Sequence, residues 1–131
     1  MVSEIKQVVI LSAGLGIRLK PITNTIPKPM LPLLNKPMLQ WNIEQFKKYG
    51  INEFFINLHY LPEVIKNYFG DGSKLGVKIT YSFEPEILGT AGALKRFKDK
   101  LDKVFFLIYG DILSLVDYTK MAEVWNKNPT P

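Results

Sequence analysis

A glycine-rich segment near the N-terminus has the residue types of an anion-binding loop. The run Lys6–Leu11 leads directly into Ser12–Gly16, with the sequence SAGLG, and Arg18 follows shortly after. Glycines let consecutive backbone N–H groups approach an anion without an intervening Cβ atom. Arginine adds a planar, permanently charged set of donors that suits phosphate oxygens. The segment predicts phosphate binding, and the alternative is an ordinary turn after a strand with a surface arginine.

Two better-known phosphate-binding signatures do not fit this segment. A Walker A loop is excluded because no Gly-Lys-Ser/Thr follows it. Leu19 stands where the dinucleotide-binding fingerprint has its third glycine. The residues therefore indicate a backbone cradle for an anion without naming the nucleotide.

Two charged residues elsewhere in the chain could act on the same ligand. Lys28 stands between Pro27 and Pro29, whose rings stiffen the backbone and reduce the entropy lost when the lysine is fixed. Asp111 follows Gly110 at the end of an apolar run, where a carboxylate could hold Mg²⁺ together with substrate phosphates. The alternatives are a solvent-facing lysine in a proline-rich loop and an aspartate that serves a turn or a helix cap.

The segment Glu84–Ala93 joins a strand end to a loop of small residues that opens a helix. A flat ring could lie against Gly89, and Glu84 could accept hydrogen bonds from a base or a sugar. Glu84 and Glu86 could instead form an acid/base pair of the glycosidase type. We reject that interpretation because exposed glutamates beside a proline are common.

Composition removes several classes of site. The sequence has no cysteine, which excludes thiolate metal sites, cysteine nucleophiles and disulfides. His59 is the single histidine, which excludes multi-histidine metal sites, and we interpret it as structural. The net charge of +5 arises from 17 basic and 12 acidic residues. Because the lysines are scattered, we interpret them as solvated helix faces and expect no nucleic-acid partner.

Length and hydropathy favour one soluble domain. The chain has 131 residues, of which 47% are hydrophobic and 22% charged, enough for a real core. The longest apolar run, Val104–Tyr109, is far shorter than the roughly 20 residues that span a bilayer. The N-terminus lacks the basic start and long apolar region of a signal peptide. We therefore expect a cytoplasmic protein that has no membrane partner.

The elements that must position these residues alternate between strand and helix. Apolar and β-branched runs predict strands over 6–11, 53–58, 77–83 and 103–109. Apolar residues at helical spacing predict helices over 37–50, 62–70 and 90–98, and a last helix capped by Asp117 with Tyr118, Met121 and Trp125 on one side. This alternation predicts an α/β fold with three layers (α/β/α) and a mostly parallel sheet.

The expected topology brings the candidate residues together. The strand that contains Val104–Tyr109 has no polar face, so we expect it in the sheet centre, beside the first strand and covered on both sides. The glycine-rich loop and Asp111 would then lie at the carboxyl ends of neighbouring strands. Sheets of this kind bind their ligands there.

Taken jointly, these motifs resemble the sugar-1-phosphate nucleotidyltransferases, the pyrophosphorylases that make nucleotide sugars. The family's opening signature reads approximately L-A-G-G-x-G-T-R-L-x-P-L-T, followed by P-K-P. This chain has LSAGLGIRLKPIT over Leu11–Thr23 and PKP over Pro27–Pro29. The segments LGTAGAL, from Leu88, and YGD, from Tyr109, are also similar to the family's. Ile17 departs from the pattern, since the family usually has Thr or Ser before the arginine.

The resemblance implies a Rossmann-like fold of the nucleotide-diphospho-sugar transferase type and a role for each matching residue. The nucleoside triphosphate would lie on the backbone of Leu11, Ser12, Ala13, Gly14, Leu15 and Gly16. Arg18 would contact its phosphates, Lys28 would neutralise charge in the transition state, and Asp111 would bind Mg²⁺. Glu84 and Gly89 would lie at the base. A sugar 1-phosphate oxygen would attack the α-phosphorus, and pyrophosphate would leave.

The resemblance also suggests which substrates the protein uses and how much of the family's catalytic domain the chain covers. The loop from Glu84 to Gly92 looks most like that of mannose-1-phosphate guanylyltransferases, which use GTP. Glucose-1-phosphate enzymes that use dTTP or UTP follow closely. Because the family's catalytic domains are longer, we expect residues 1–131 to be a truncated, nucleotide-binding half that binds nucleotide without turnover and self-associates as a homo-oligomer. The alternatives are a non-catalytic regulatory or assembly subunit of the same fold and, more distantly, a Rossmann dehydrogenase.

Overall fold

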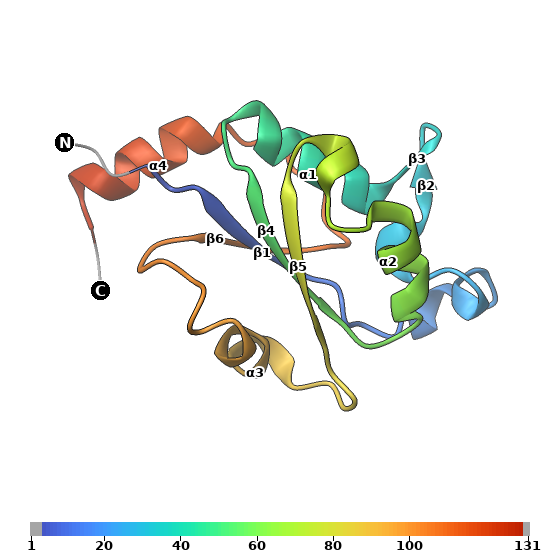
Figure 1. The fold of residues 1–131 in the computed structure, drawn as a ribbon. Coiled ribbons are helices and arrows are strands. Elements are labelled where there is room, and N and C mark those ends of the chain that lie inside the picture. The colour runs from blue at the N-terminus through green and yellow to red at the C-terminus, as the bar shows by residue number, and fades with distance from the viewer. Residues whose placement is uncertain (1–3, 130–131) are drawn as a thin grey trace.

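The central strands carry apolar side chains on both faces, as strands covered by helices on two sides must. The structure is a computed structural model that describes residues 4–129. Val8 and Ile10 of the first strand face one group of packed side chains, and Val9 faces another. Helices therefore cover both faces, and the expected three-layer α/β/α architecture is confirmed (Figure 1).

The main sheet has four parallel strands in the order β5-β4-β1-β6. Its strands are β1 (Gln7–Leu11), β4 (Glu53–Leu58), β5 (Lys78–Phe83) and β6 (Phe106–Tyr109). The α-helices are α1 (Met38–Lys48), α2 (Pro62–Phe69), α3 (Gly89–Arg96) and α4 (Tyr118–Lys127). A short antiparallel pair, β2 (Pro32–Leu33) and β3 (Lys36–Pro37), precedes α1. The four strands of the main sheet and the four α-helices follow the sequence predictions to within a few residues, whereas the β2–β3 pair was not predicted.

Short 3₁₀ turns replace regular structure in the proline-rich stretch after β1. They are η1 (Ile17–Leu19), η2 (Ile22–Asn24) and η3 (Lys28–Met30), and a further one, η4 (Ser73–Leu75), precedes β5. The prolines prevent a continuous helix here, as expected. Over residues 4–129, no helix is long and apolar enough to cross a membrane.

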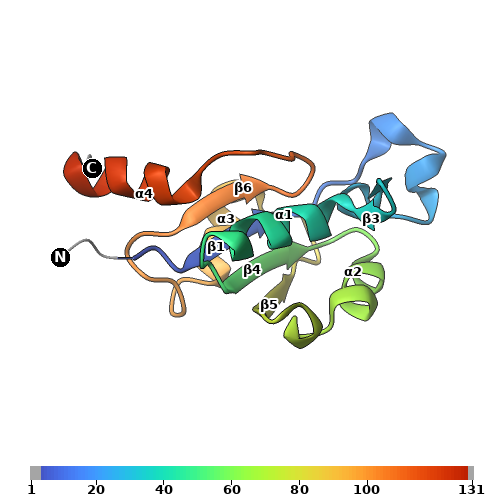
Figure 2. The same ribbon diagram turned by 90° about the horizontal axis from the view of Figure 1, so that it is seen from above.

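Aromatic packing fixes the helices on the sheet. Seen from above, α1 lies in front of the strands and α3 lies behind them (Figure 2). On the α1 side, the rings of Phe46 and Tyr118 stack with their centroids 4.0 Å apart, and Phe46 meets Phe54 edge-on at 6.3 Å. On the α3 side, Phe97 packs on Phe55 at 5.2 Å. Offset and edge-on pairs of this kind add to the stabilisation from burial.

The last strand does not lie where its apolar sequence predicts. β6 pairs with β1, as expected, but it is an edge strand of the sheet over the described residues and not a central one. Phe106 is buried on the α1 side, whereas Leu107 on the other face is 40% exposed. The expectation of cover on both sides is wrong for this chain, because Leu107 and Tyr109 on that face are both exposed.

The last helix begins as predicted, but one of the three residues predicted on one side of it, Met121, does not pack inward. The carboxylate of Asp117 accepts a hydrogen bond from the backbone N–H of Lys120 at 3.0 Å, which confirms the expected cap. Tyr118 is buried, but Met121 is 46% exposed and Ala122 packs against the core instead. The expected inner position of Met121 is therefore wrong. A spacing of four residues from Tyr118 keeps Ala122 on the buried face.

Candidate functional site

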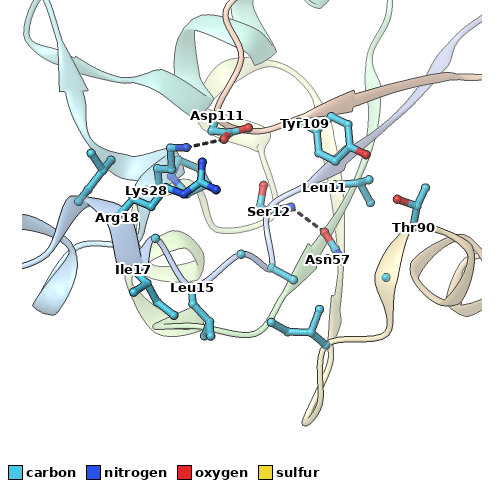
Figure 3. Close-up of a pocket in the computed structure, with 17 residues that line it drawn as sticks. Leu11, Ser12, Leu15, Ile17, Arg18, Lys28, Asn57, Thr90, Tyr109 and Asp111 are labelled. Carbon is cyan, nitrogen blue, oxygen red and sulfur yellow. Dashed lines mark hydrogen bonds and ion pairs between the residues drawn. The ribbon is translucent and has the colours of Figure 1, made fainter.

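A pocket of about 530 Å³ opens at the carboxyl ends of the parallel strands. Figure 3 shows its lining side chains, which come from segments far apart in the sequence. The lining comprises residues 11–19, Lys28 and Pro29, Asn57, Ile87, Gly89 and Thr90, Tyr109, and Asp111. The volume falls in the range of ordinary small-molecule sites. The glycine-rich loop, Arg18, Lys28, Gly89 and Asp111 are thus brought to one cavity.

The glycine-rich loop is bent at Gly16 and held there by Thr23. Gly16 has φ 63, and an added Cβ would lie 2.9 Å from Cγ2 of Thr23, so the position requires glycine. The hydroxyl of Thr23, a fully buried residue, donates to the Gly16 carbonyl at 2.7 Å. The hydroxyl of Tyr60 in turn donates to the Thr23 carbonyl at 2.6 Å. The last residue of the family-like signature, Thr23, therefore shapes the loop from beneath.

The beginning of the same loop is fixed by the end of β4. The backbone N–H of Ser12 donates to Oδ1 of Asn57 at 2.7 Å, and Asn57 is 3% exposed. Asn57 also lines the pocket. The motifs in the sequence do not single it out. Its only signal is a polar side chain near the end of the otherwise apolar strand EFFINL.

Lys28 and Asp111 form an ion pair on the pocket wall. Nζ of Lys28 lies 2.6 Å from Oδ2 of Asp111, and the two side chains are 39% and 35% exposed. Arg18 lies beside the pair (Figure 3). The three charged residues that the sequence picks out are therefore neighbours at the same end of the cavity. Within residues 4–129, no group of three or more His, Cys, Asp or Glu side chains could hold a metal ion.

Glu84 is placed differently from the expectation that it lies at a base. Its side chain is fully buried and does not line the pocket. Oε2 accepts from Nδ2 of Asn57 at 2.9 Å, and Oε1 accepts from the backbone N–H of Leu88 at 3.0 Å. Its burial and its absence from the pocket lining place the Glu84 carboxylate away from the cavity surface in this arrangement. Nδ1 of His59 lies 2.6 Å from the Glu84 carbonyl oxygen, which accords with a structural histidine.

Gly89 and three residues without a predicted role complete the other wall of the pocket. Gly89 begins α3 with φ 72, and an added Cβ would meet no heavy atom within 4 Å. Ile87, Thr90 and Tyr109 also line the cavity. Thr90 and Tyr109 belong to the family-like segments LGTAGAL and YGD. The sequence therefore singled out these two segments, but it did not indicate that either side chain lines the pocket.

Residues 7–130 match a protein-family model described as "Nucleotidyl transferase". A D-glycero-alpha-D-manno-heptose 1-phosphate guanylyltransferase of Campylobacter jejuni is 44% identical, with 88% of this chain and 52% of the relative covered. A UTP–glucose-1-phosphate uridylyltransferase of Synechocystis sp. is 41% identical, with 88% of this chain and 33% of the relative covered. The chain thus spans a third to a half of the length of these curated relatives.

A solved structure supports the same comparison. The crystal structure of HddC from Yersinia pseudotuberculosis is similar with a TM-score of 0.79 and 32% sequence identity. The similarity covers 92% of this chain and 54% of that one. A second structure of HddC, complexed with GMP-PN, has the same TM-score of 0.79.

Proposed function

Because this chain belongs to the nucleotidyl transferase family, we propose that residues 1–131 form the nucleotide-binding half of a sugar-1-phosphate nucleotidyltransferase catalytic domain. The observation that carries the proposal is the convergence of Arg18, Lys28 and Asp111 on the cavity lined by the glycine-rich loop. These groups supply positive charge, backbone donors and one carboxylate. Such groups bind a triphosphate and its cation.

We assign the phosphates to the glycine-rich loop and to the positively charged side chains of Arg18 and Lys28. Arg18 and Lys28 line the pocket together with residues 12–16. At Gly14 an added Cβ would meet no protein atom within 4 Å, so the protein's own packing does not require glycine there. A ligand that approaches the backbone closely supplies a reason for it. The open space beside Gly14 therefore supports the interpretation of the loop as a phosphate-binding site over its interpretation as an ordinary turn.

Mg²⁺ is assigned to Asp111. Oδ2 of this carboxylate faces Lys28 at 2.6 Å, and the side chain is 35% exposed on the pocket wall. Magnesium is ordinarily held by one or two carboxylates with the remaining positions filled by phosphate oxygens and water, so this donor set fits the ion. When bound, the cation supplies further neutralisation of phosphate charge.

The reaction proposed for the whole catalytic domain is nucleotidyl transfer, in which the protein acts by positioning the substrates. A sugar 1-phosphate oxygen forms a bond to the α-phosphorus of the triphosphate, and the bond from the α-phosphorus to the bridging oxygen breaks to release pyrophosphate. Lys28 and Arg18 stabilise the charge that develops on the phosphates, and the loop holds the triphosphate in line. No covalent nucleophile is needed for this chemistry.

GTP and mannose 1-phosphate are our proposed substrates. The loop from Glu84 to Gly92 resembles that of mannose-1-phosphate guanylyltransferases, and the Campylobacter jejuni relative is by name a guanylyltransferase of a manno-heptose 1-phosphate. The Synechocystis relative, by name a uridylyltransferase of glucose 1-phosphate, makes UTP the second candidate. dTTP with glucose 1-phosphate is the third.

Nucleotide binding with and without Mg²⁺ tests the proposal. Calorimetric titration with GTP, UTP, dTTP and ATP should show binding that Mg²⁺ strengthens, with GTP the tightest. Ile17, which is 62% exposed where the family has a hydroxyl residue, favours the alternative of a non-catalytic subunit. Triphosphate binding that is indifferent to Mg²⁺ would support that alternative. A lack of any triphosphate binding would contradict the proposed function and leave the non-catalytic subunit.

A further inference from the structure

Two loops that line opposite sides of the pocket are joined by hydrogen bonds through two buried side chains, Asn57 and Glu84. The backbone N–H of Ser12 donates to Oδ1 of Asn57 at 2.7 Å, and Nδ2 of Asn57 donates to Oε2 of Glu84 at 2.9 Å. The backbone N–H of Leu88 donates to Oε1 of Glu84 at 3.0 Å. Asn57 is 3% exposed and Glu84 is not exposed at all. These hydrogen bonds connect the glycine-rich loop, through Asn57 in the pocket lining, to the residue that precedes Gly89.

The backbone N–H groups of Ser12 and Leu88, at the two ends of this series of hydrogen bonds, determine which group donates in each bond. A backbone N–H can only donate, so Ser12 requires the oxygen of the Asn57 amide and turns its nitrogen towards Glu84. The N–H of Leu88 likewise requires an acceptor at Oε1. Glu84 must therefore accept at both oxygens, which is what a carboxylate does best. Hydrogen bonds of this kind compensate the desolvation of a buried carboxylate.

On its other side, Ser12 lies close to Gly110. An added Cβ at Gly110, directly after β6, would lie 2.5 Å from Oγ of Ser12 and 3.2 Å from the carbonyl oxygen of Leu11. Ser12 is 2% exposed. Its position is thus set between Gly110 on one side and the amide of Asn57 on the other.

We propose that Asn57 and Glu84 are positioning residues that set the spacing between the glycine-rich loop and Gly89. Glu84 acts on the nucleotide through Asn57, Ser12 and Leu88, and not by touching the base. The inference rests on the proposed function, which assigns the phosphates to the glycine-rich loop, and on the expectation from the family resemblance that the base lies at Gly89. A nucleotide that bridges the two loops binds tightly only if their separation is already correct, because ordering them on binding weakens affinity.

An exchange of the two side-chain types tests the chain of hydrogen bonds. In Glu84→Gln alone, the new amide nitrogen faces either Nδ2 of Asn57 or the N–H of Leu88, and two donors then oppose each other. In Asn57→Asp alone, two carboxylates face each other. The double variant Asn57→Asp/Glu84→Gln restores every bond with the overall charge unchanged. The carboxylate introduced at position 57 accepts from the N–H of Ser12 and from the amide nitrogen introduced at position 84, whose amide oxygen accepts from the N–H of Leu88.

The matched control makes the same exchange at exposed positions. Asn52 and Glu86 lie near the two sites in sequence, and both are exposed. The control is therefore Asn52→Asp/Glu86→Gln. The measurements are calorimetric affinities for GTP, UTP and dTTP with Mg²⁺, and amide hydrogen exchange at Ser12 and Leu88 followed by NMR.

We expect each single variant to bind all three triphosphates about tenfold or more weakly and to exchange both amides faster than the parent. The double variant should bind within about threefold of the parent and regain slow exchange, and the control should resemble the parent throughout. If a single variant does not fold, the double variant alone decides the question.

Three results would overturn the inference. The first is a double variant that does not fold or that binds as weakly as the single variants. The second is a change in preference among GTP, UTP and dTTP in Glu84→Gln that Asn57→Asp does not reverse, since Glu84 would then contact the base. The third is slow exchange at Ser12 and Leu88 in every variant. A parent that binds no triphosphate would contradict the proposed function instead, and amide exchange would still test the hydrogen bonds.

Discussion

The ammonium nitrogen of Lys28 lies 2.6 Å from Oδ2 of Asp111, although 83 positions separate the two residues in the sequence. Both side chains are more than a third exposed. An ion pair of this exposure contributes about 0–1 kcal/mol to stability, so a ligand can separate it at small cost. The lysine assigned to phosphate and the carboxylate assigned to the cation are therefore each other's partners until a triphosphate and Mg²⁺ arrive together.

The variant Asp111→Asn should abolish the effect of Mg²⁺ on triphosphate affinity. Asparagine keeps the shape of the side chain but lacks the charge that a hard cation requires. Because the pair with Lys28 is exposed, the free energy of unfolding should change by no more than about 1 kcal/mol. Calorimetry with and without Mg²⁺, together with thermal unfolding, measures both effects. An undiminished Mg²⁺ effect in the variant would contradict the assignment of the cation to Asp111.

The variants Arg18→Ala and Lys28→Ala should weaken binding of GTP far more than binding of guanosine. Each cation is assigned to phosphate, and a charge-assisted hydrogen bond is worth about 1.5–3 kcal/mol. Titration with both ligands measures the difference, and Lys20→Ala, at an exposed neighbouring lysine that does not line the pocket, is the control. Equal losses for GTP and guanosine would remove the phosphate assignment.

The variant Gly14→Ala should separate binding from stability. No protein atom lies within 4 Å of the added Cβ, and Gly14 is not among the residues of positive φ, so folding should be unaffected. Triphosphate affinity should fall because the methyl group occupies the path of the ligand to the backbone. Thermal unfolding and calorimetry on the same sample check the two parts. Unchanged affinity would show that no phosphate approaches Gly14.

Unlike Gly14→Ala, the variant Gly110→Ala should lower both the stability of the protein and its affinity for a triphosphate. Its Cβ would lie 2.5 Å from Oγ of Ser12 and 3.2 Å from a backbone oxygen, and overpacking of this kind destabilises by about 1–3 kcal/mol. We expect a lower unfolding temperature together with weaker triphosphate binding, since Ser12 must move. A stable variant with unchanged affinity would mean that the loop tolerates displacement.

Residues 1–131 should bind a triphosphate but not turn it over. The chain spans a third to a half of the length of its curated relatives, and alignment of a second substrate can supply about 7–11 kcal/mol of a barrier. Over residues 4–129, β6 is an edge strand with Leu107 exposed, and open edges recruit partners, so we also expect self-association. Pyrophosphate release with mannose or glucose 1-phosphate and analytical sedimentation test the two expectations. Turnover by a monomer would contradict both.

Much of the fold follows from local patterns in the sequence. The runs that became β1 and β4 are largely apolar on both faces, the run that became β5 alternates, and the helices between them carry apolar residues at helical spacing. Strands that alternate with helices favour parallel pairing, and parallel strands present their carboxyl ends at one edge. That rule suffices to bring the glycine-rich loop and Asp111 together without any knowledge of side-chain contacts.

The tertiary structure alone decided which side chains pair and which strand lies at the edge. An apolar run indicates that a strand tends to be buried, but it does not indicate which strands or helices lie next to it. The sequence therefore could not distinguish β6 from a central strand. Sequence patterns favour an exposed glutamate, but Glu84 is fully buried, and its hydrogen bonds to Asn57 and Leu88 compensate the carboxylate for the loss of water. Asn57 belongs to no recognisable motif. Its partners, Ser12 in the loop after β1 and Glu84 directly after β5, lie far from it in the sequence. Hydrogen bonds between distant segments depend on how the chain folds back, and no local pattern encodes that.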